Sequence, residues 1–542
     1  MPADEEKTTS PEITSFSQVG SVGVANNREH SPDSHGLHRL LNNRQIQLIA
    51  TGGSIGAALL FIAYVFYTCV LVLVNNSIAE MSTYMPASGG FIRLAGYWVD
   101  ALGSVAGWNF FFYEALLIPF EITALNLVIS FWNSNVTSPG PTAGICAAVI
   151  DCYAIFNILA VKYYGEAEFW LSGGKLILIS SSLPSPLLRW SAAILKAIVN
   201  AFAEFHTEGD LGRFEGLLAA LWNAAFTIVG PEYISMVVAE ATHPSVYIKS
   251  AFKTVYYRFC IFFILGALTG GIVVPYNNPT LVNIYFGTGE GGGTAAASPY
   301  VIAMENLSIH VLPHIVNALI LTSIFSASNI YTYCATRSLY SLAIEGRAPR
   351  FLYYCNNSGV LIYCFCVVML FPCLSFLQFS KGADLACQYC HRGGLITFLI
   401  MSITFLNYYQ ACKVQGIDRK EMPYYGYFQP FGAYITIATQ LVILISYGYS
   451  SFTPWNISDF LANYTMQLVA PCFFIGWKVI KKTRYIRPNE VDLIWKRPAI
   501  DAYENSITTP PLGFWTEIIG LVGFSRAEKS QADAWGGRSP FL

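Results

Sequence analysis

Two interruptions within long apolar runs carry the residues of this chain that are best suited to chemistry. Residues 52–56 place a glycine cluster in the first run, and residues 227–232 place a Gly-Pro pair and a carboxylate in a later one. A helix that breaks among apolar residues frees N–H and C=O groups, which are tolerated only where they are buried in protein or line a polar cavity. Such breaks hold small solutes. The candidate binding residues are Gly52, Gly53, Ser54, Gly56, Thr227, Gly230 and Glu232.

Structural explanations compete with binding at both interruptions. Small residues at 52–56 also allow close helix packing, and Gly230-Pro231 alone is sufficient to kink a helix. Glu232 would either contact a solute or cap the helix that follows. The position of the second break as a counterpart of the first favours binding.

Carboxylates inside apolar runs form a second group of candidates. Glu114 and Glu121 lie seven residues apart, so they share one face of a helix. Ionisable residues in a membrane segment are costly and are functional candidates by default. Glu121 has the stronger case, against the alternative of a structural hydrogen bond, and Glu114 the weaker one.

Composition indicates a membrane protein. Of 542 residues, 54% are hydrophobic and only 12% are charged, about half of the charged fraction of a soluble protein. The net charge of −2 gives no sign of nucleic-acid binding. Residues 1–37 are polar and lack the apolar segment of a cleavable signal peptide, so the first membrane helix is expected to direct insertion.

An all-α integral membrane fold is predicted, because about 20 apolar residues cross a bilayer as a helix. Lys and Arg favour cytoplasmic loops, and they follow the sixth, eighth, tenth and twelfth predicted spans, which places both termini in the cytosol. The predicted domains are a disordered tail (1–37), a membrane domain (38–485) and a cytosolic tail (486–542). The predicted spans are residues 44–56, 57–79, 104–131, 142–161, 168–183, 215–238, 255–275, 311–335, 359–378, 393–411, 430–449 and 462–480.

A series of ordered motifs resembles the fungal amino-acid permeases of the amino acid–polyamine–organocation superfamily. The likeness covers residues 38–495, and two short segments, 415–418 and 490–493, look most like the dicarboxylic amino-acid branch. The motifs are the glycine break, Ala79-Glu80-Met81, Pro86 to Phe91, Gly107-Trp108-Asn109, Gly165 to Trp170, Ser298-Pro299-Tyr300, Phe325 to Asn329 and Glu345 to Pro349.

The resemblance implies two inverted five-helix repeats plus two further helices, with helices 1 and 6 broken. The carboxylate of an amino acid is favoured at a half-helix N-terminus and its ammonium at freed carbonyls. In proton-coupled relatives a lysine of helix 5 replaces a sodium ion, and Lys175 is the candidate here, with snorkelling to the interface as the alternative. Glu121 matches a family glutamate, and Ser326 and Asn329 are expected polar partners of Lys175.

Three stretches depart from the family pattern: residues 54–60, 180–200 and 383–392. The first truncates helix 1, and the other two bring Arg and Lys into loops predicted to be extracellular. We interpret them as signs of a mis-spliced or decaying gene.

The predicted function is proton-coupled amino-acid symport into the cell by alternating access, with no enzyme activity and no cofactor or metal. The alternatives are a non-transporting amino-acid receptor on the same fold, and an inactive product of the altered gene. The expected partners are the amino acid, protons and the lipid bilayer, with trafficking and ubiquitination machinery on the tails. The plasma membrane is the expected location.

Overall fold

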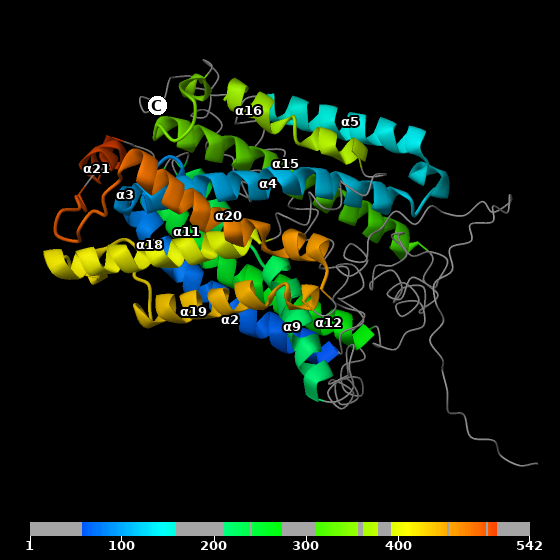
Figure 1. Cartoon of the computed structure of the whole chain (residues 1–542), viewed down its shortest axis with the longest axis horizontal. Coiled ribbons are helices and arrows are strands. Elements are labelled where there is room, and N and C mark those ends of the chain that lie inside the picture. The colour runs from blue at the N-terminus through cyan, green and yellow to red at the C-terminus, as the bar shows by residue number, and fades with distance from the viewer. Residues whose placement is uncertain are drawn as a thin grey trace, which may run out of the picture. The chain divides into compact units, whose positions relative to one another are not determined.

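Helices dominate the computed structural model of the chain, as Figure 1 shows. The residues described are 57–158, 210–238, 241, 243–273, 311–355, 361–377, 392–452, 455–494 and 497–506. Within them, the strand-like pairings are isolated β-bridges, Val99 with Tyr485 and Phe452 with Trp455. The all-α prediction is confirmed.

The helices follow one another with short connections over most of the described chain. Their bounds are α2 (Ala57–Tyr84), α3 (Gly90–Trp98), α4 (Asp100–Ile129), α5 (Pro139–Ile158), α9 (Asp210–Thr227), α10 (Pro231–Val237), α11 (Pro244–Arg258), α12 (Leu265–Val273), α15 (Leu312–Ile344), α16 (Ile362–Val368), α18 (Gly393–Gln415), α19 (Phe431–Ser446), α20 (Ile457–Lys481) and α21 (Arg497–Ser506). A π-helix, η3 (Phe259–Ile264), joins α11 to α12, and the short 3-10 helices are η1 (Ser134–Thr137), η5 (Arg350–Tyr353), η6 (Pro372–Leu377), η7 (Arg419–Glu421) and η8 (Tyr449–Ser451).

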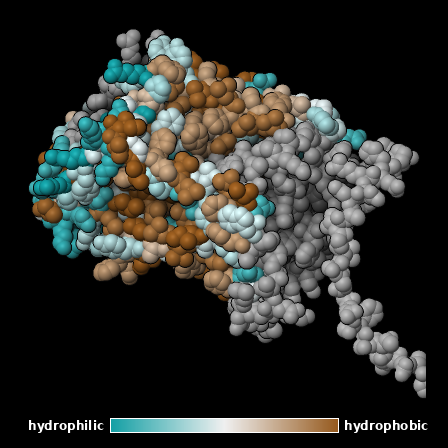
Figure 2. All heavy atoms as spheres, in the orientation of Figure 1, coloured by the Kyte–Doolittle hydropathy of each residue, from teal (hydrophilic) through white to brown (hydrophobic). Residues whose placement is uncertain are grey.

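Seven helices of the described chain are long and apolar enough to cross a membrane. They overlap predicted spans, and the shorter apolar segments Ile362–Leu377 and Phe431–Ser446 lie where two more were predicted. Figure 2 shows hydrophobic residues gathered over the helical bundle, with hydrophilic ones at the end where α3 and α21 lie. The predicted spans at 44–56 and 168–183, and most of the three departing stretches, lie outside the described residues.

The seventh predicted span begins earlier than its hydropathy suggested. Helix α11 starts at Pro244 instead of near residue 255, since proline is well placed in the first turn of a helix. Lys249 and Lys253, which the predicted spans left in a loop, therefore lie within a helix, and that assignment was wrong. Arg258 is the last residue of α11, where the π-helix begins.

The predicted span at 359–378 is interrupted instead of continuous. Helix α16 ends at Val368, and the 3-10 helix η6 begins at Pro372. Proline lacks the N–H that would continue an α-helix and clashes with the preceding turn, so the interruption follows from its position.

Helix α3 was not among the predicted elements, and two glycines place it against other helices. Gly89 and Gly90 have φ values of 89° and 51°, which residues with a side chain rarely adopt. A Cβ on Gly90 would overlap the backbone of Ser235 in α10. The Phe91 N–H donates to Ser235 Oγ over 2.8 Å, so the start of α3 is joined directly to α10.

Helix α4 lies between two buried clusters and organises the bundle. One cluster joins residues of α4 to α2, α3, α10, α11 and α18, and the other joins α4 to α5, α15 and α16. Phe110 of α4 packs edge-to-face on Phe91 of α3, with ring centroids 5.1 Å apart. Polar residues on α4 are therefore held inside the bundle.

Candidate functional site

The predicted helix break at residues 227–232 is confirmed. Helix α9 ends at Thr227 and α10 begins at Pro231. Gly230 between them has a φ of 157° and a ψ of −48°, and a Cβ there would overlap the guanidinium of Arg258. Glycine is favoured at this position because a side chain would force the guanidinium of Arg258 to move.

Two charged side chains satisfy backbone groups at the break. Arg258 donates from Nη2 to the Val229 carbonyl over 2.7 Å. The Gly230 N–H donates to Oε2 of Glu232 over 3.0 Å. A cation beside the carbonyl end of a helix interacts favourably with the helix dipole. The second oxygen of Glu232, Oε1, has no hydrogen-bond partner among the described residues.

Thr227 presents the exposed side of the break. Its hydroxyl donates to the Asn223 carbonyl over 2.8 Å and accepts from the Tyr64 hydroxyl over 3.3 Å. Tyr64 also donates to the Asn223 side chain over 2.6 Å. These bonds join α9 to α2 next to the broken segment.

A buried carboxyl cluster lies beside the break. Glu114 of α4 and Glu232 of α10 are both inaccessible to solvent, with exposed fractions of 0% and 1%. They are near enough to interact electrostatically, and Tyr233 also interacts with Glu114. Neither oxygen of Glu114 has a hydrogen-bond partner in the described part of the chain.

The predicted coupling residues lie toward α5 and α15. Glu121 is half-buried and interacts electrostatically with Tyr153 of α5 and Tyr331 of α15. Asn329 accepts a hydrogen bond from Asn157 Nδ2 over 2.8 Å. Ser326 is fully buried on the same helix as Asn329. The remaining candidates lie outside the described residues: Gly52, Gly53, Ser54, Gly56 and Lys175.

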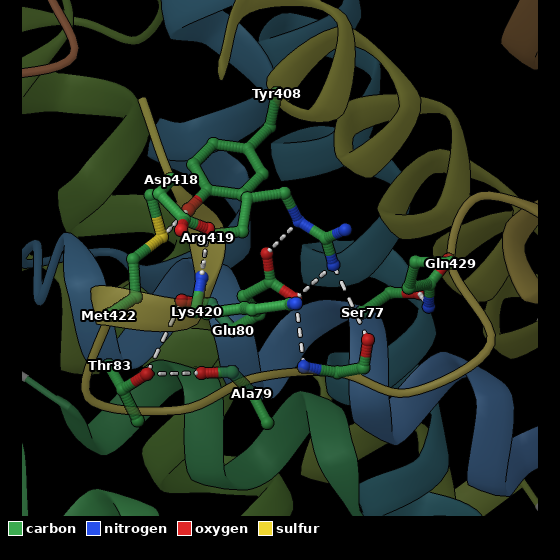
Figure 3. Close-up of polar contacts among 11 residues, drawn as sticks. Ser77, Ala79, Glu80, Thr83, Tyr408, Asp418, Arg419, Lys420, Met422 and Gln429 are labelled. Atoms are coloured by element: carbon green, nitrogen blue, oxygen red, sulfur yellow. Dashed lines mark hydrogen bonds and ion pairs between the residues drawn. The ribbon is translucent and has the colours of Figure 1, made fainter. Parts of the chain in front are cut away.

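A third buried carboxylate, Glu80 of α2, has a complete set of partners (Figure 3). Arg419 donates from Nε and Nη2 to its two oxygens over 2.6 and 2.7 Å, and the Gly426 N–H donates over 2.9 Å. Burial acts to lower the pKa of Arg419, yet the hydrogen bonds and charge of Glu80 outweigh it and raise that pKa. This network fastens the α18–α19 connection to α2.

Arg347, within the Glu345-to-Pro349 motif, makes a comparable attachment. Its guanidinium donates to Asp100 Oδ1 over 2.8 and 2.9 Å, and Trp477 donates to Oδ2 of the same aspartate over 2.7 Å. Glu345 pairs with Arg93 of α3 over 2.8 Å. The motif therefore joins the ends of α15, α3, α4 and α20.

Sequence reasoning missed the tyrosines and the arginine that surround the two buried carboxyls. Tyr113, Tyr233, Tyr331 and Arg258 are far apart in sequence and form no motif, so only the signal of polar residues in apolar runs would have found them. In the described residues, no group of three or more His, Cys, Asp or Glu is placed to hold a metal ion.

The comparisons with known proteins agree with this architecture. The amino acid permease family profile matches residues 46–487. The general amino acid permease AGP2 of Saccharomyces cerevisiae is 34% identical over 86% of this chain and 83% of its own length. The proline-specific permease of Emericella nidulans is 30% identical over 91% and 93%, and the probable lysine/arginine permease CAN2 of Candida albicans is 30% identical over 86% of both chains.

A bundle of apolar helices with a polar break inside it is typical of membrane transporters. The chain belongs to the amino acid permease family. It is a multi-pass integral membrane protein that transports amino acids, and it is not an enzyme. The resemblance seen in the sequence is confirmed, and the dicarboxylic branch stays a prediction.

Proposed function

We propose that the protein imports amino acids together with protons by alternating access around the helix break. The observation that carries this proposal is the buried break at Gly230, with carboxyls of α4 and α10 beside it. Glu114 and Glu232 offer acidic groups that exchange protons, and the break offers backbone groups that bind charged atoms. Residues 52–56, Thr227, Gly230 and Glu232 form the proposed substrate site.

The proposed coupling site comprises Lys175, Glu121, Ser326 and Asn329. Its support is the convergence of α4, α5 and α15 around Glu121 and Asn329. A carboxyl and a set of amides on three helices can change partners when the helices rock. The protein would lie in the plasma membrane with both termini in the cytosol, where its tails would meet trafficking and ubiquitination machinery.

The relatives suggest which substrates to try first. Their names describe a general amino acid permease, a proline-specific permease and a lysine/arginine permease. Proline, lysine and an acidic amino acid therefore form the informative panel, and uptake of the acidic one would support the dicarboxylic branch.

The test is uptake of this labelled panel in a yeast strain that lacks its own permeases. We expect accumulation that is faster at acidic pH and is abolished by a protonophore. A Gly230→Ala variant, tested at equal surface expression, should lose uptake. Binding at the cell surface without accumulation would indicate a receptor, and retention inside the cell would indicate an inactive product.

A further inference from the structure

Glu114 is a buried carboxyl that the family motifs do not explain. It lies near the middle of α4 with no exposed surface, between Tyr113 and Ala115, which are also buried. Neither of its oxygens has a hydrogen-bond partner among the described residues. Buried carboxylates normally have partners, because an ionised group without them is unstable away from water.

Among the described residues, the groups that interact with Glu114 do not supply a compensating charge. They are Glu232 and Tyr233 of α10, Tyr113 of α4 and Tyr331 of α15. A carboxylate and neutral phenols carry no positive charge; the Tyr233 hydroxyl favours the ionised form of Glu114, but burial and the charge of Glu232 both oppose it. Beyond them, Arg258 and Tyr67 interact with Glu232, and Arg258 already donates to Val229.

Two neighbouring carboxyls in one buried cluster disfavour double ionisation. Glu232 is the better candidate for the charged member, because it accepts the Gly230 N–H and lies near Arg258. Glu114 then holds a proton in this state. Glu114 could be neutralised by a proton or by the ammonium group of a substrate. The proton is the better candidate, because it needs no cavity next to the buried carboxyl.

We propose that Glu114 is a proton-carrying carboxyl that shares its proton equilibrium with Glu232 across the helix break. The O–H bond on Glu114 forms with a proton from one side of the membrane. The O–H bond is broken again when the interrupted segment around Gly230 becomes open to the opposite side of the membrane, and the proton passes to water there. This assignment rests on the proposed proton symport, and it adds to that symport a second site on α4, about two helical turns before Glu121.

Infrared spectroscopy tests the proton without requiring transport. Purified wild-type protein in lipid should show the C=O stretch of a protonated carboxyl at neutral pH, and Glu114→Gln should lack it. Glu490→Gln, which changes a surface carboxylate, is the control and should leave the band unchanged. An identical band in Glu114→Gln would overturn the proposal.

Reconstituted vesicles test the role of that proton in coupling. Glu114→Gln mimics the protonated state, so we expect it to retain exchange of labelled for unlabelled amino acid. Accumulation driven by a pH gradient should fall at least tenfold. Retained accumulation with the wild-type pH profile would overturn the proposal, as would loss of exchange in a folded variant, which would indicate substrate binding.

Glu114→Asp keeps the test decisive if the glutamine variant fails to fold. It retains a titratable group, so it should keep gradient-driven accumulation with a displaced pH profile; an unchanged profile would contradict the assignment. If wild-type protein exchanges substrate yet ignores the pH gradient, proton symport itself fails, whereas the infrared band would still report whether Glu114 is protonated.

Discussion

Glu80 of α2 and Glu114 of α4 are both fully buried glutamates, and their surroundings differ completely. Glu80 has both oxygens bound by Arg419 and accepts a further backbone N–H from Gly426. Glu114 has neither oxygen bound in the described residues, and Glu232 is intermediate, with one oxygen bound.

The contrast separates a structural carboxylate from a functional one. Full pairing fixes the position of Glu80 and opposes any change in its protonation. An unpaired carboxyl remains free to gain and lose a proton or to take a new partner. Burial of a charged residue type therefore says little about its role until its partners are counted.

The largest effect on stability is expected at Glu80. Glu80→Gln leaves Arg419 nearly buried without its charge partner, which should cost about 3 to 5 kcal/mol of folding free energy. Heating of the detergent-solubilised protein, followed by size-exclusion chromatography, measures the loss. Glu490→Gln removes an exposed pair and should cost less than about 0.5 kcal/mol. Equal losses of stability in the two variants would show that the buried Glu80 pair contributes no more than the exposed Glu490 pair.

The next effect concerns the half-satisfied Glu232. Gly230→Ala forces a Cβ into the guanidinium of Arg258 and strains a φ of 157°, which should cost about 1 to 3 kcal/mol. The same thermal assay measures it. Gly140→Ala is the matched control, because nothing lies within 4 Å of a Cβ at that helical glycine. Unchanged thermal stability of Gly230→Ala would argue against the close contact with Arg258.

A smaller effect is expected at Asp100, whose pairing is complete but whose side chain is 39% exposed. Asp100→Asn keeps the shape while removing the charge that faces Arg347, and water screens part of the loss. We expect a cost of about 1 kcal/mol. A loss as large as that of Glu80→Gln would show that exposure does not reduce the contribution of these pairs.

The smallest effect on stability is expected at Glu114. Glu114→Gln replaces a carboxyl whose oxygens have no hydrogen-bond partner within the described part of the chain, so the folding free energy should change by less than about 1 kcal/mol. Thermal denaturation at pH 7 provides the measurement, while transport changes as described above. Strong destabilisation would mean that Glu114 has a partner and serves a structural role, as Glu80 does.

Much of the fold was predictable because membrane helices leave a local signal. Apolar runs located the seven long spans, and Gly230-Pro231 located the break. The α3 helix was missed since it is short and depends on Gly90 fitting against Ser235. Arg419 and Glu80 are 339 residues apart, so no local pattern pairs them. Lys249 and Lys253 were assigned to a loop because positive charges favour cytoplasmic loops, whereas both lie in α11.

The segment after α20 is fastened to the bundle at several points. Tyr97 donates to the Asp492 carbonyl over 2.8 Å, and Gln415 donates to the Pro488 and Val491 carbonyls over 2.9 and 2.7 Å. Ser245 holds Glu504 of α21 through backbone and hydroxyl over 2.8 and 2.7 Å.

These attachments decide where a fluorescent reporter should be fused. A reporter fused directly after Lys481 would remove the segment of residues 482–506, which is hydrogen-bonded to the bundle. A reporter fused beyond Ser506 would keep this segment and its hydrogen bonds.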